Sequence, residues 1–509
     1  MTPDQPTVVQ LRRGAYHDSV SLLQVSRAVA GADGVTAAQV AMATDLNVEV
    51  LTGMGFDVPA EAGPNDLVVA LRGESEEALH TGLAAVESEL AGLRGGSGDG
   101  GGMGQAPPPR TIGSAARAAD ANLALISVPG RHAVTETFDA IAAGLSVMLF
   151  SDHVSVEDEI RLKDAARDAG VLVMGPDCGT ALVRGVALGF ANAVREGSIG
   201  LVAASGTGAQ QVMCLLDAAG VGVSHCLGVG GRDLRSAVGG RSTRQALAAL
   251  ADDPQTSSVI VVSKPPDEAV LADIELAAKE LGLDVHWAIL GEGRPDLTAA
   301  VASALEALGE AVPAWPAHVA DDEPGDLPIG PALRGLFCGG TLAEEAMIVA
   351  GASLDDPIRS NIAHDEALHV SGHDRVEGHV VVDFGDDEMT QGRAHPMIDP
   401  SLRMARIAVE AADPACGVLL LDLVLGHGAH PDPAGELADA IRAARDRAHT
   451  DRRALPVVVS LTGTDADPQR YARTADTLAA AGASVFLSNA AAARHATQLL
   501  ASATAGRAS

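Results

Sequence analysis

The sequence has 509 residues, of which 47% are hydrophobic and only 2% aromatic. Several domains of helices packed on sheets fit this length and composition better than one aromatic-lined sandwich. A formal net charge of −32, with no basic tract, argues against a nucleic-acid partner and is typical of a solvated acidic surface.

The sequence also bears on where the protein acts. No apolar stretch reaches membrane-spanning length, and the first residues, MTPDQPTVVQLRRG, lack the pattern of a secretory signal. We therefore expect a cytoplasmic protein with no membrane partner. The five cysteines are scattered without a CxxC pair, so we expect buried thiols and neither a disulfide framework nor a zinc site.

Two composition shifts divide the chain. A glycine run followed by prolines, residues 95–109, and a stretch rich in proline and acid, residues 311–330, have the makeup of interdomain linkers. They leave three units, at residues 1–94, 110–310 and 331–505. The predicted fold class is α/β for the two larger units, preceded by a small α+β domain.

The first unit mixes the two kinds of local pattern. Short β-like runs such as TVVQLRR and DLVVALRG alternate with helical patterns such as SVSLLQVSRAVA. This order predicts a small α+β sandwich.

The second unit repeats strand and helix. Its apolar runs end in small and polar residues, as in NLALISVPG, LSVMLFSD, GVLVMGPDCG and SIGLVAASG. Apolar strands separated by helix-length segments indicate a mainly parallel sheet with helices on both faces. Open sheets of this kind bind ligands at the carboxyl ends of their strands, which is where these polar residues fall.

The third unit repeats the order of the second. SIGLVAASGTGAQQVMCLLDAAG is matched by LRGLFCGGTLAEEAMIVAGA, and CLGVGGRD by VVVDFGDDE. ALADDPQTSSVIVVSKPPD is then matched by AADPACGVLLLDLVLGHGAHPD. The shared order of glycine turn, strand and Asp-Pro favours a duplicated domain over two unrelated α/β units.

Two glycine turns of this repeat open predicted helices. They consist of Ser205, Gly206 and Thr207 in one copy and Gly339, Gly340 and Thr341 in the other. A helix N-terminus offers unpaired N–H groups and the positive end of its dipole. Two such ends facing each other would hold one phosphate or acyl phosphate, which Lys264 at a strand end could neutralise. The alternatives are an ordinary N-cap and a surface ion pair of Lys264.

Three further residues are candidates for catalysis. Arg393 and His395 follow a strand end, where Arg393 could bind a carboxylate and His395 could act as acid or base near neutral pH. The alternative, which the sequence supports equally well, is that this segment is a structural loop. His427 is the histidine best suited to lie near a transferred group, with a helix cap as its alternative. We expect the acidic residues Asp383, Asp386, Asp387 and Glu388 to form a solvated turn, with Mg²⁺ binding through their oxygen atoms as the alternative, and we predict no metal site.

Several segments resemble a known superfamily. GVLVMGPDCGTALV, EGSIGLVAASGTGAQQ and LGVGGRDL resemble the α-subunit of succinyl-CoA synthetase, in the NDP-forming acyl-CoA synthetase superfamily. CGGTLAEEA, VVDFGDDE and VLLLDLVLGHGAH resemble the C-terminal domain of its β-subunit. Over nearly the whole chain, YHDSVSLLQVSR, LVMGPDCGT, GVGGRDL, VSKPP, CGGTLAEEA and GRAHPMIDP resemble, in this order, the FdrA family of acyl-CoA synthetase-like proteins.

The resemblance implies a division of the two larger units. It implies a CoA-binding-like Rossmann domain at 110–195, an α-type flavodoxin-like domain at 196–310 and a β-type one at 331–505. It also makes CoA a possible cofactor. The residues that the resemblance implies for the cofactor-binding segment are Gly175, Pro176, Asp177 and Cys178.

Three parts of the superfamily's machinery have no counterpart in the sequence. These are the Gly-His-Ala-Gly loop that carries phosphohistidine, the ATP-grasp domain, and the N-terminal glycine loop that binds CoA. The glycine turns remain, so the resemblance implies an enzyme subunit that handles an acyl phosphate.

The FdrA resemblance implies a specific reaction. It links the chain to carbamoyl transfer in allantoin breakdown, in which oxalurate and phosphate give oxamate and carbamoyl phosphate. We predict this reaction, with phosphate or carbamoyl phosphate as substrate, companion subunits and a possible homo-oligomer. Two alternatives stay open: an NDP-forming acyl-CoA synthetase subunit whose nucleotide site lies on a partner, and a non-catalytic regulatory subunit.

Overall fold

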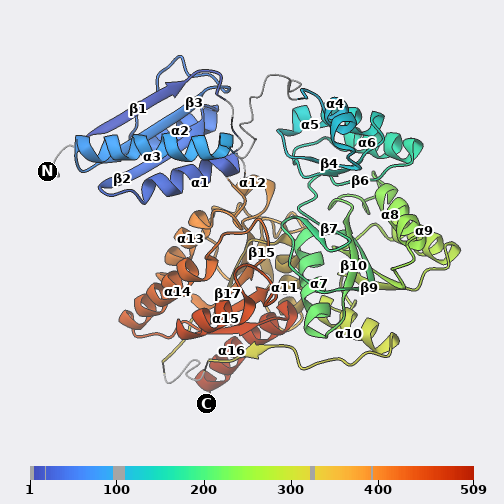
Figure 1. Cartoon of the computed structure of the whole chain (residues 1–509). Helices are drawn as coiled ribbons and strands as arrows, with labels where there is room; N and C mark the ends of the chain where they lie inside the picture. The colour runs from blue at the N-terminus through green and yellow to red at the C-terminus, as the bar shows by residue number, and fades with distance from the viewer. Residues whose placement is uncertain are drawn as a thin grey trace. The chain divides into compact units, whose positions relative to one another are not determined.

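The computed structural model describes residues 5–15, 17, 19–95, 109–320, 327–390 and 394–508. It divides into two compact units (Figure 1), Met1–Pro108 with Gln391–Ala394, and Pro109–Thr390 with His395–Ser509. Within the described residues, no helix is long and apolar enough to cross a membrane.

The smaller unit is an antiparallel sheet in the order β1-β3-β2, accompanied by three helices. In chain order its elements are β1 (Thr7–Arg12), α1 (Ser19–Ala30), β2 (Val35–Met42), α2 (Asp45–Gly53), β3 (Leu67–Gly73) and α3 (Glu76–Gly95). The central strand β3 is buried on both faces. Leu67 and Leu71 pack in one cluster with α1 and α3, while Val68 packs in another with Leu51 of α2. The predicted small α+β domain is confirmed.

In its described residues the larger unit contains three sheets, of which the first is parallel with the order β4-β5-β6. Its elements are α4 (Ile112–Ala119), β4 (Leu123–Ile126), α5 (Gly130–Ala142), β5 (Ser146–Leu149), α6 (Val156–Ala169) and β6 (Val173–Met174). Val147 and Leu149 of the middle strand are fully buried among residues of these helices, which explains the continuous apolar run in this strand.

The second sheet has six strands in the order β12-β11-β9-β10-β7-β8. The elements are β7 (Thr180–Val183), β8 (Val186–Gly189), β9 (Glu196–Ala204), α7 (Gly206–Ala218), β10 (Val223–Gly228), α8 (Arg241–Ala251), β11 (Ser258–Ser263), α9 (Glu268–Glu280), β12 (Val285–Ile289) and α10 (Leu297–Ala307). β9 to β12 are parallel, whereas β7 and β8 form an antiparallel hairpin. The hairpin lies in the segment expected to belong to the preceding domain, but β7 pairs with β10 and so joins this sheet.

The third sheet has seven strands in the order β13-β19-β18-β17-β14-β16-β15. The strands are β13 (Ala317–His318), β14 (Ala332–Phe337), β15 (Ile358–Ser360), β16 (His379–Asp383), β17 (Cys416–Val424), β18 (Val457–Thr462) and β19 (Ala483–Phe486). The helices are α11 (Gly340–Gly351), α12 (Asp387–Thr390), α13 (Ser401–Ala411), α14 (Pro433–Thr450), α15 (Tyr471–Ala480) and α16 (Asn489–Ala508). Strand β13 falls in the expected second linker, where it pairs with the sheet edge at β19.

The two larger sheets share one strand order. In the six-stranded sheet β9 lies between β10 and β11, with β12 outermost, and in the seven-stranded sheet β14 lies between β16 and β17, followed by β18 and β19. This is the doubly wound, flavodoxin-like order, in which ligands bind at the carboxyl ends of the strands where the order reverses. The predicted flavodoxin-like α/β fold is confirmed, and α7 and α11 occupy equivalent places after the first strand of each sheet.

Buried polar contacts join these two sheets along α7. Gln211 of α7 donates to the carbonyl of Leu487 at 2.9 Å and accepts from the hydroxyl of Thr462 at 3.1 Å. Asn192, just before β9, donates to the carboxylate of Asp467 at 2.8 Å. Because buried polar groups are costly when unpaired, these contacts favour one relative placement of the two sheets.

Glu345 makes a further buried contact, between α11, α10 and α16. Its Oε1 accepts from the backbone N–H of Leu297 at 2.7 Å, and its Oε2 accepts from the side chain of Asn489 at 2.8 Å. Burial raises the pKa of Glu345 to about 7, although both hydrogen bonds oppose the shift. The carboxyl therefore holds its proton more tightly in the folded than in the unfolded chain.

This shift predicts a pH dependence of stability that Glu345→Gln removes. The folded state binds the extra proton between the unfolded pKa and the folded pKa, so Glu345 lowers the free energy of unfolding as pH rises towards 7, by about 3 kcal/mol in total. We expect Glu345→Gln to lose less stability than the wild type between pH 5 and pH 8 in urea unfolding. Parallel pH curves for the two proteins would contradict this account of Glu345.

Candidate functional site

The N-termini of α7 and α11 come together at the carboxyl ends of β9 and β14. Ser205 caps α7, since its hydroxyl accepts from the backbone N–H of Gly208 at 3.0 Å. The same hydroxyl lies 2.6 Å from the hydroxyl of Thr341 in the first turn of α11. α11 follows Gly339, which has no side chain to cap it. The two predicted turns thus meet, and α11 has the more open N-terminus.

Glycines permit this close contact. A Cβ atom on Gly208 would lie 3.0 Å from Cγ2 of Thr341, and one on Gly339 would lie 2.7 Å from Cγ2 of Thr207. Larger residues at either position would therefore push the two helix ends apart. At Gly206 the nearest neighbour of an added Cβ is 3.4 Å away, an ordinary contact. Gly206 is the position of this turn that can accept a side chain.

A buried carboxylate positions the turn before α11. Asp422, in β17, accepts from the backbone N–H groups of Cys338 at 2.8 Å and Gly339 at 3.0 Å. Arg403 of α13 donates to Asp422 at 2.7 Å, and both side chains are almost fully buried. Asp422 was not among the predicted site residues, although an acid within the apolar run LLLDLVL is an unusual signal. It acts on the site by fixing the backbone.

Lys264 and Asp383 lie beside the first residue of α11. A Cβ atom on Gly340 would be 2.5 Å from Oδ2 of Asp383 and 2.9 Å from Nζ of Lys264. Asp383 is only 4% exposed, and burial raises its pKa to about 7 against the opposing charge of Lys264. The expected solvated turn is therefore wrong for Asp383, because this residue ends the buried strand β16.

His395 lies near the same place but does not suit acid–base chemistry at neutral pH. Its ring centroid is 5.4 Å from that of Phe190, and its Nδ1 accepts from the backbone N–H of Met397 at 3.3 Å. A Cβ atom on Gly385 would lie 2.9 Å from Nε2 of His395. Burial, with the charge of Arg403, lowers the pKa of His395 to about 4. The ring is neutral at pH 7 and better suited to hydrogen bonding than to proton transfer.

His427, another predicted catalytic residue, is not joined to Lys264 and Asp383 in the described part of the chain. His427 is exposed in the loop after β17, where its backbone N–H donates to the carbonyl of Ala191 at 2.8 Å. Among the residues that the structure describes, no hydrogen bond or ion pair joins the His427 ring to Lys264 or Asp383. Arg393 lies outside the described residues.

The predicted cofactor-binding segment follows β6. The peptide bond between Gly175 and Pro176 is cis. Asp177 as a whole residue is exposed. Burial of its carboxyl group by the surrounding protein, together with the charges of Asp387 and Asp152, raises its pKa to about 7. Cys178 is buried, and burial raises the pKa of its thiol to about 12, so it is no nucleophile near neutral pH. Asp177 is the side chain of this segment that solvent can reach.

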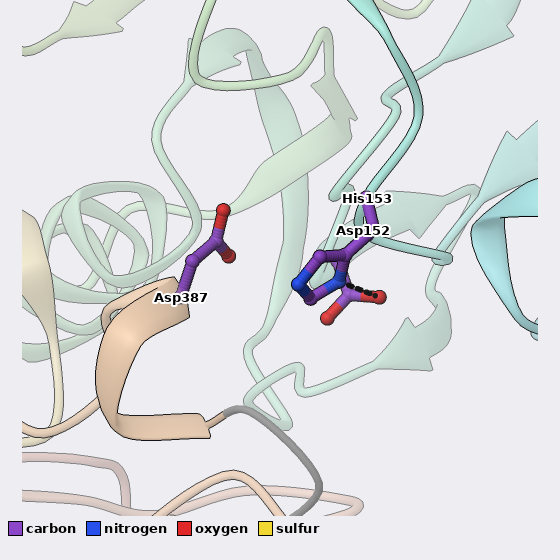
Figure 2. A group of neighbouring side chains, drawn as sticks. All are labelled: Asp152, His153 and Asp387. Carbon is purple, nitrogen blue, oxygen red and sulfur yellow. Dashed lines mark ion pairs between the residues drawn. The ribbon is translucent and has the colours of Figure 1, made fainter.

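Three exposed side chains near Asp177 have a spacing that could hold a metal ion. Asp152 and His153 follow β5 and Asp387 begins α12, with potential ligand atoms within 4.8 Å of one another (Figure 2). Nδ1 of His153 lies 2.9 Å from Asp152. The hydrogen bond to Asp152 and the nearby carboxylates raise the pKa of His153, so a protonated imidazole would also balance the two acids. The polar strand end FSD can be recognised in the sequence, but its proximity to Asp387 depends on tertiary packing.

Models of two protein families match parts of the chain. One, described as "AllF, heavy metal-associated domain", matches residues 4–106, and the other, described as "CoA-ligase", matches residues 336–499. Residues 4–106 contain no cysteine, so they offer none of the thiolates that soft metals prefer. The second match covers the unit that contains α11.

Relatives extend the likeness to most of the chain. The uncharacterized protein YahF of Escherichia coli is 38% identical over 90% of this chain and 92% of its own length. Subunit alpha 2 of the ADP-forming succinate–CoA ligase of Archaeoglobus fulgidus is 28% identical over 42% of this chain and 79% of its own length. The alpha subunit from Methanothermobacter thermautotrophicus is 27% identical over 40% of this chain and 74% of its own length. The chain therefore belongs to the FdrA-like family of acyl-CoA synthetase-like proteins that includes YahF, within the succinyl-CoA synthetase superfamily.

Proposed function

We propose that the chain is an enzyme subunit that binds the phosphate group of an acyl phosphate where α7 and α11 meet. The observation that carries this proposal is the direct contact of the two helix N-termini, 2.6 Å apart at their hydroxyls, with Lys264 beside the uncapped end of α11. Unpaired N–H groups, the helix dipole and a lysine all favour a bound anion over water or a neutral ligand.

The specific reaction that we propose is phosphate-dependent carbamoyl transfer in allantoin catabolism. An oxygen of phosphate attacks the ureido carbonyl of oxalurate, and the bond from that carbon to the oxamate nitrogen breaks. The nitrogen takes up a proton, and the products are carbamoyl phosphate and oxamate. This chemistry uses a phosphate site but needs neither a nucleotide nor a phosphohistidine, in keeping with a sequence that lacks both parts of the ligase machinery.

A second candidate is acyl-CoA ligation with the nucleotide site on a partner subunit. The match of residues 336–499 to the CoA-ligase family favours it, as do relatives named as alpha subunits of succinate–CoA ligase. In this case Asp177 and the segment around it would lie near CoA. Both candidate functions imply a companion subunit. If the chain has no catalytic activity, it would instead be a regulatory subunit.

Thermal unfolding with four ligands separates these functions. We would measure Tm of the full chain with phosphate, carbamoyl phosphate, CoA and ATP with Mg²⁺ in parallel. A ligand at 100 times its Kd adds roughly 2.7 kcal/mol, which raises Tm by about 3 °C. Carbamoyl transfer predicts stabilisation by phosphate and carbamoyl phosphate but not by ATP.

Two variants of Gly206 show whether a response belongs to the helix pair. Since this position accepts a side chain, Gly206→Glu should place a carboxylate at the start of α7 and remove the response to both phosphates. Gly206→Gln introduces a side chain of the same size without the charge and should keep most of the response to both phosphates. Stabilisation by CoA and Mg-ATP alone would favour ligation, and no response to any ligand would favour a regulatory subunit.

A further inference from the structure

The second carboxyl oxygen of Asp383, Oδ2, lies at the uncapped N-terminus of α11 and has no assigned role. The carboxyl is only 4% exposed, and its Oδ1 accepts from the backbone N–H of Gly385 at 2.9 Å. Among the described residues, no hydrogen bond or ion pair reaches Oδ2. This oxygen is directed at Gly340, where it would lie 2.5 Å from an added Cβ. An oxygen without a hydrogen-bond partner in the described residues, on a carboxyl group that is almost fully buried, thus borders the helix end that is open to an anion.

The Asp383 carboxylate and a bound anion repel each other when both are charged and lie at the N-terminus of α11. An ionised Asp383 beside α11 competes with any incoming anion for the same N–H groups and for Lys264, whereas a protonated Asp383 can donate a hydrogen bond to the anion. We infer that α11, Lys264 and Asp383 form one site for tetrahedral oxyanions such as phosphate, in which each bound dianion is accompanied by a proton on Asp383. This inference rests on the proposed function, because it describes the same phosphate site.

The charged groups around Asp383 fit this assignment. Lys264 comes from the end of β11, Asp386 follows β16, and Asp422 belongs to β17, where Arg403 pairs with it. His395, whose Nε2 lies near Gly385, is neutral above pH 5, since its pKa is about 4. Burial together with the two aspartates outweighs Lys264 and raises the pKa of Asp383 to about 7. A bound dianion would raise it further, so the proton is taken up on binding above neutral pH.

Sulfate is the probe that isolates this proton. Unlike phosphate, sulfate stays a dianion from pH 6 to pH 9, so any proton taken up on binding must go to the protein. For the full chain we expect Kd for sulfate to weaken about tenfold per pH unit between pH 8 and pH 9. Calorimetry at pH 8 in two buffers of different ionisation enthalpy should show about one proton taken up per sulfate.

Asp383→Asn is the decisive variant, because the amide keeps the Oδ1 acceptor for Gly385 and imitates the protonated acid. It should bind sulfate with the same Kd from pH 6 to pH 9 and without proton uptake. Asp386→Asn, which removes a neighbouring charge that does not border Gly340, should keep both the pH slope and the proton uptake.

The outcomes separate this inference from the function on which it rests. A wild-type Kd for sulfate that is the same at pH 6 and pH 9, or a pH slope that survives in Asp383→Asn, would overturn the linked proton while leaving the phosphate site intact. Failure of the wild type to bind both sulfate and phosphate would overturn the anion site itself, and the proposed function with it.

Discussion

We expect Gly340→Ala to weaken phosphate binding by about 10- to 100-fold, the loss expected when one or two charge-assisted hydrogen bonds are removed. The added Cβ would lie 2.5 Å from Oδ2 of Asp383 and 2.9 Å from Nζ of Lys264. Both atoms lie at the ends of side chains that can move, so the fold can accommodate the methyl group. It can do so only if Lys264 and Asp383 move away from the N-terminus of α11. The measurement is calorimetric titration of the full-length variant with phosphate at pH 7.

Gly351→Ala provides the matched control at the other end of the same helix. No atom lies within 4 Å of a Cβ added there, so the fold and the phosphate affinity should both stay as in the wild type. Equal phosphate affinity in Gly340→Ala and Gly351→Ala would show that the anion does not bind at the start of α11.

Lys163→Met is expected to cause the largest loss of stability, about 3–5 kcal/mol, because it removes the buried cation that Glu159 and Asp233 share and leaves Asp233 without a cation, while Glu159 keeps Arg232. Nζ of Lys163 is fully buried, 2.7 Å from Glu159 and 2.8 Å from Asp233, and it also donates to the carbonyl of Val229 at 2.9 Å. Lys163 lies on α6 and Asp233 follows β10, so the ion pair joins the three-stranded sheet region to the six-stranded one. We expect Tm to fall by about 5 °C.

An exposed position on the same helix shows that burial is the cause. Arg167 forms ion pairs with Asp164 and Asp168 on the surface of α6. Such pairs are screened by water, so Arg167→Met should leave Tm almost unchanged. A similar small change in Lys163→Met would mean that Arg232 beside Glu159 and the hydrogen bonds that Asp233 accepts from Thr243 are sufficient, and that the buried ion pair does not hold these two parts together.

Local patterns predicted the parallel α/β layout of the larger unit, whereas its flavodoxin-like fold was expected from the resemblance to the superfamily. The apolar strands and the glycine turns after them repeat in order along the sequence, and the two sheets repeat the same strand order. The start of α7 at Ser205 and the start of α11 after Gly339 follow from capping chemistry, which involves only neighbouring residues. The turns that carry the proposed function were therefore visible in the sequence.

Contacts between distant segments could not be predicted in this way. Asp383 looked like part of a solvated acidic turn, yet its place at the end of a central strand buries it against Lys264. Lys163 lies in a strongly charged helical segment, where nothing local distinguishes it from the exposed Arg167. Likewise, the hairpin of β7 and β8 joins the six-stranded sheet only through its pairing with β10. Each of these features depends on tertiary packing, which periodicity and turn motifs do not encode.

Calorimetric titration of the intact chain with carbamoyl phosphate tests the central claim most directly. The account predicts one binding site per chain, competition by inorganic phosphate, loss of binding in Gly206→Glu, and no requirement for ATP or CoA. No binding of carbamoyl phosphate or phosphate, in a preparation that binds CoA, would contradict the acyl phosphate site at α7 and α11 and leave acyl-CoA ligation as the better account.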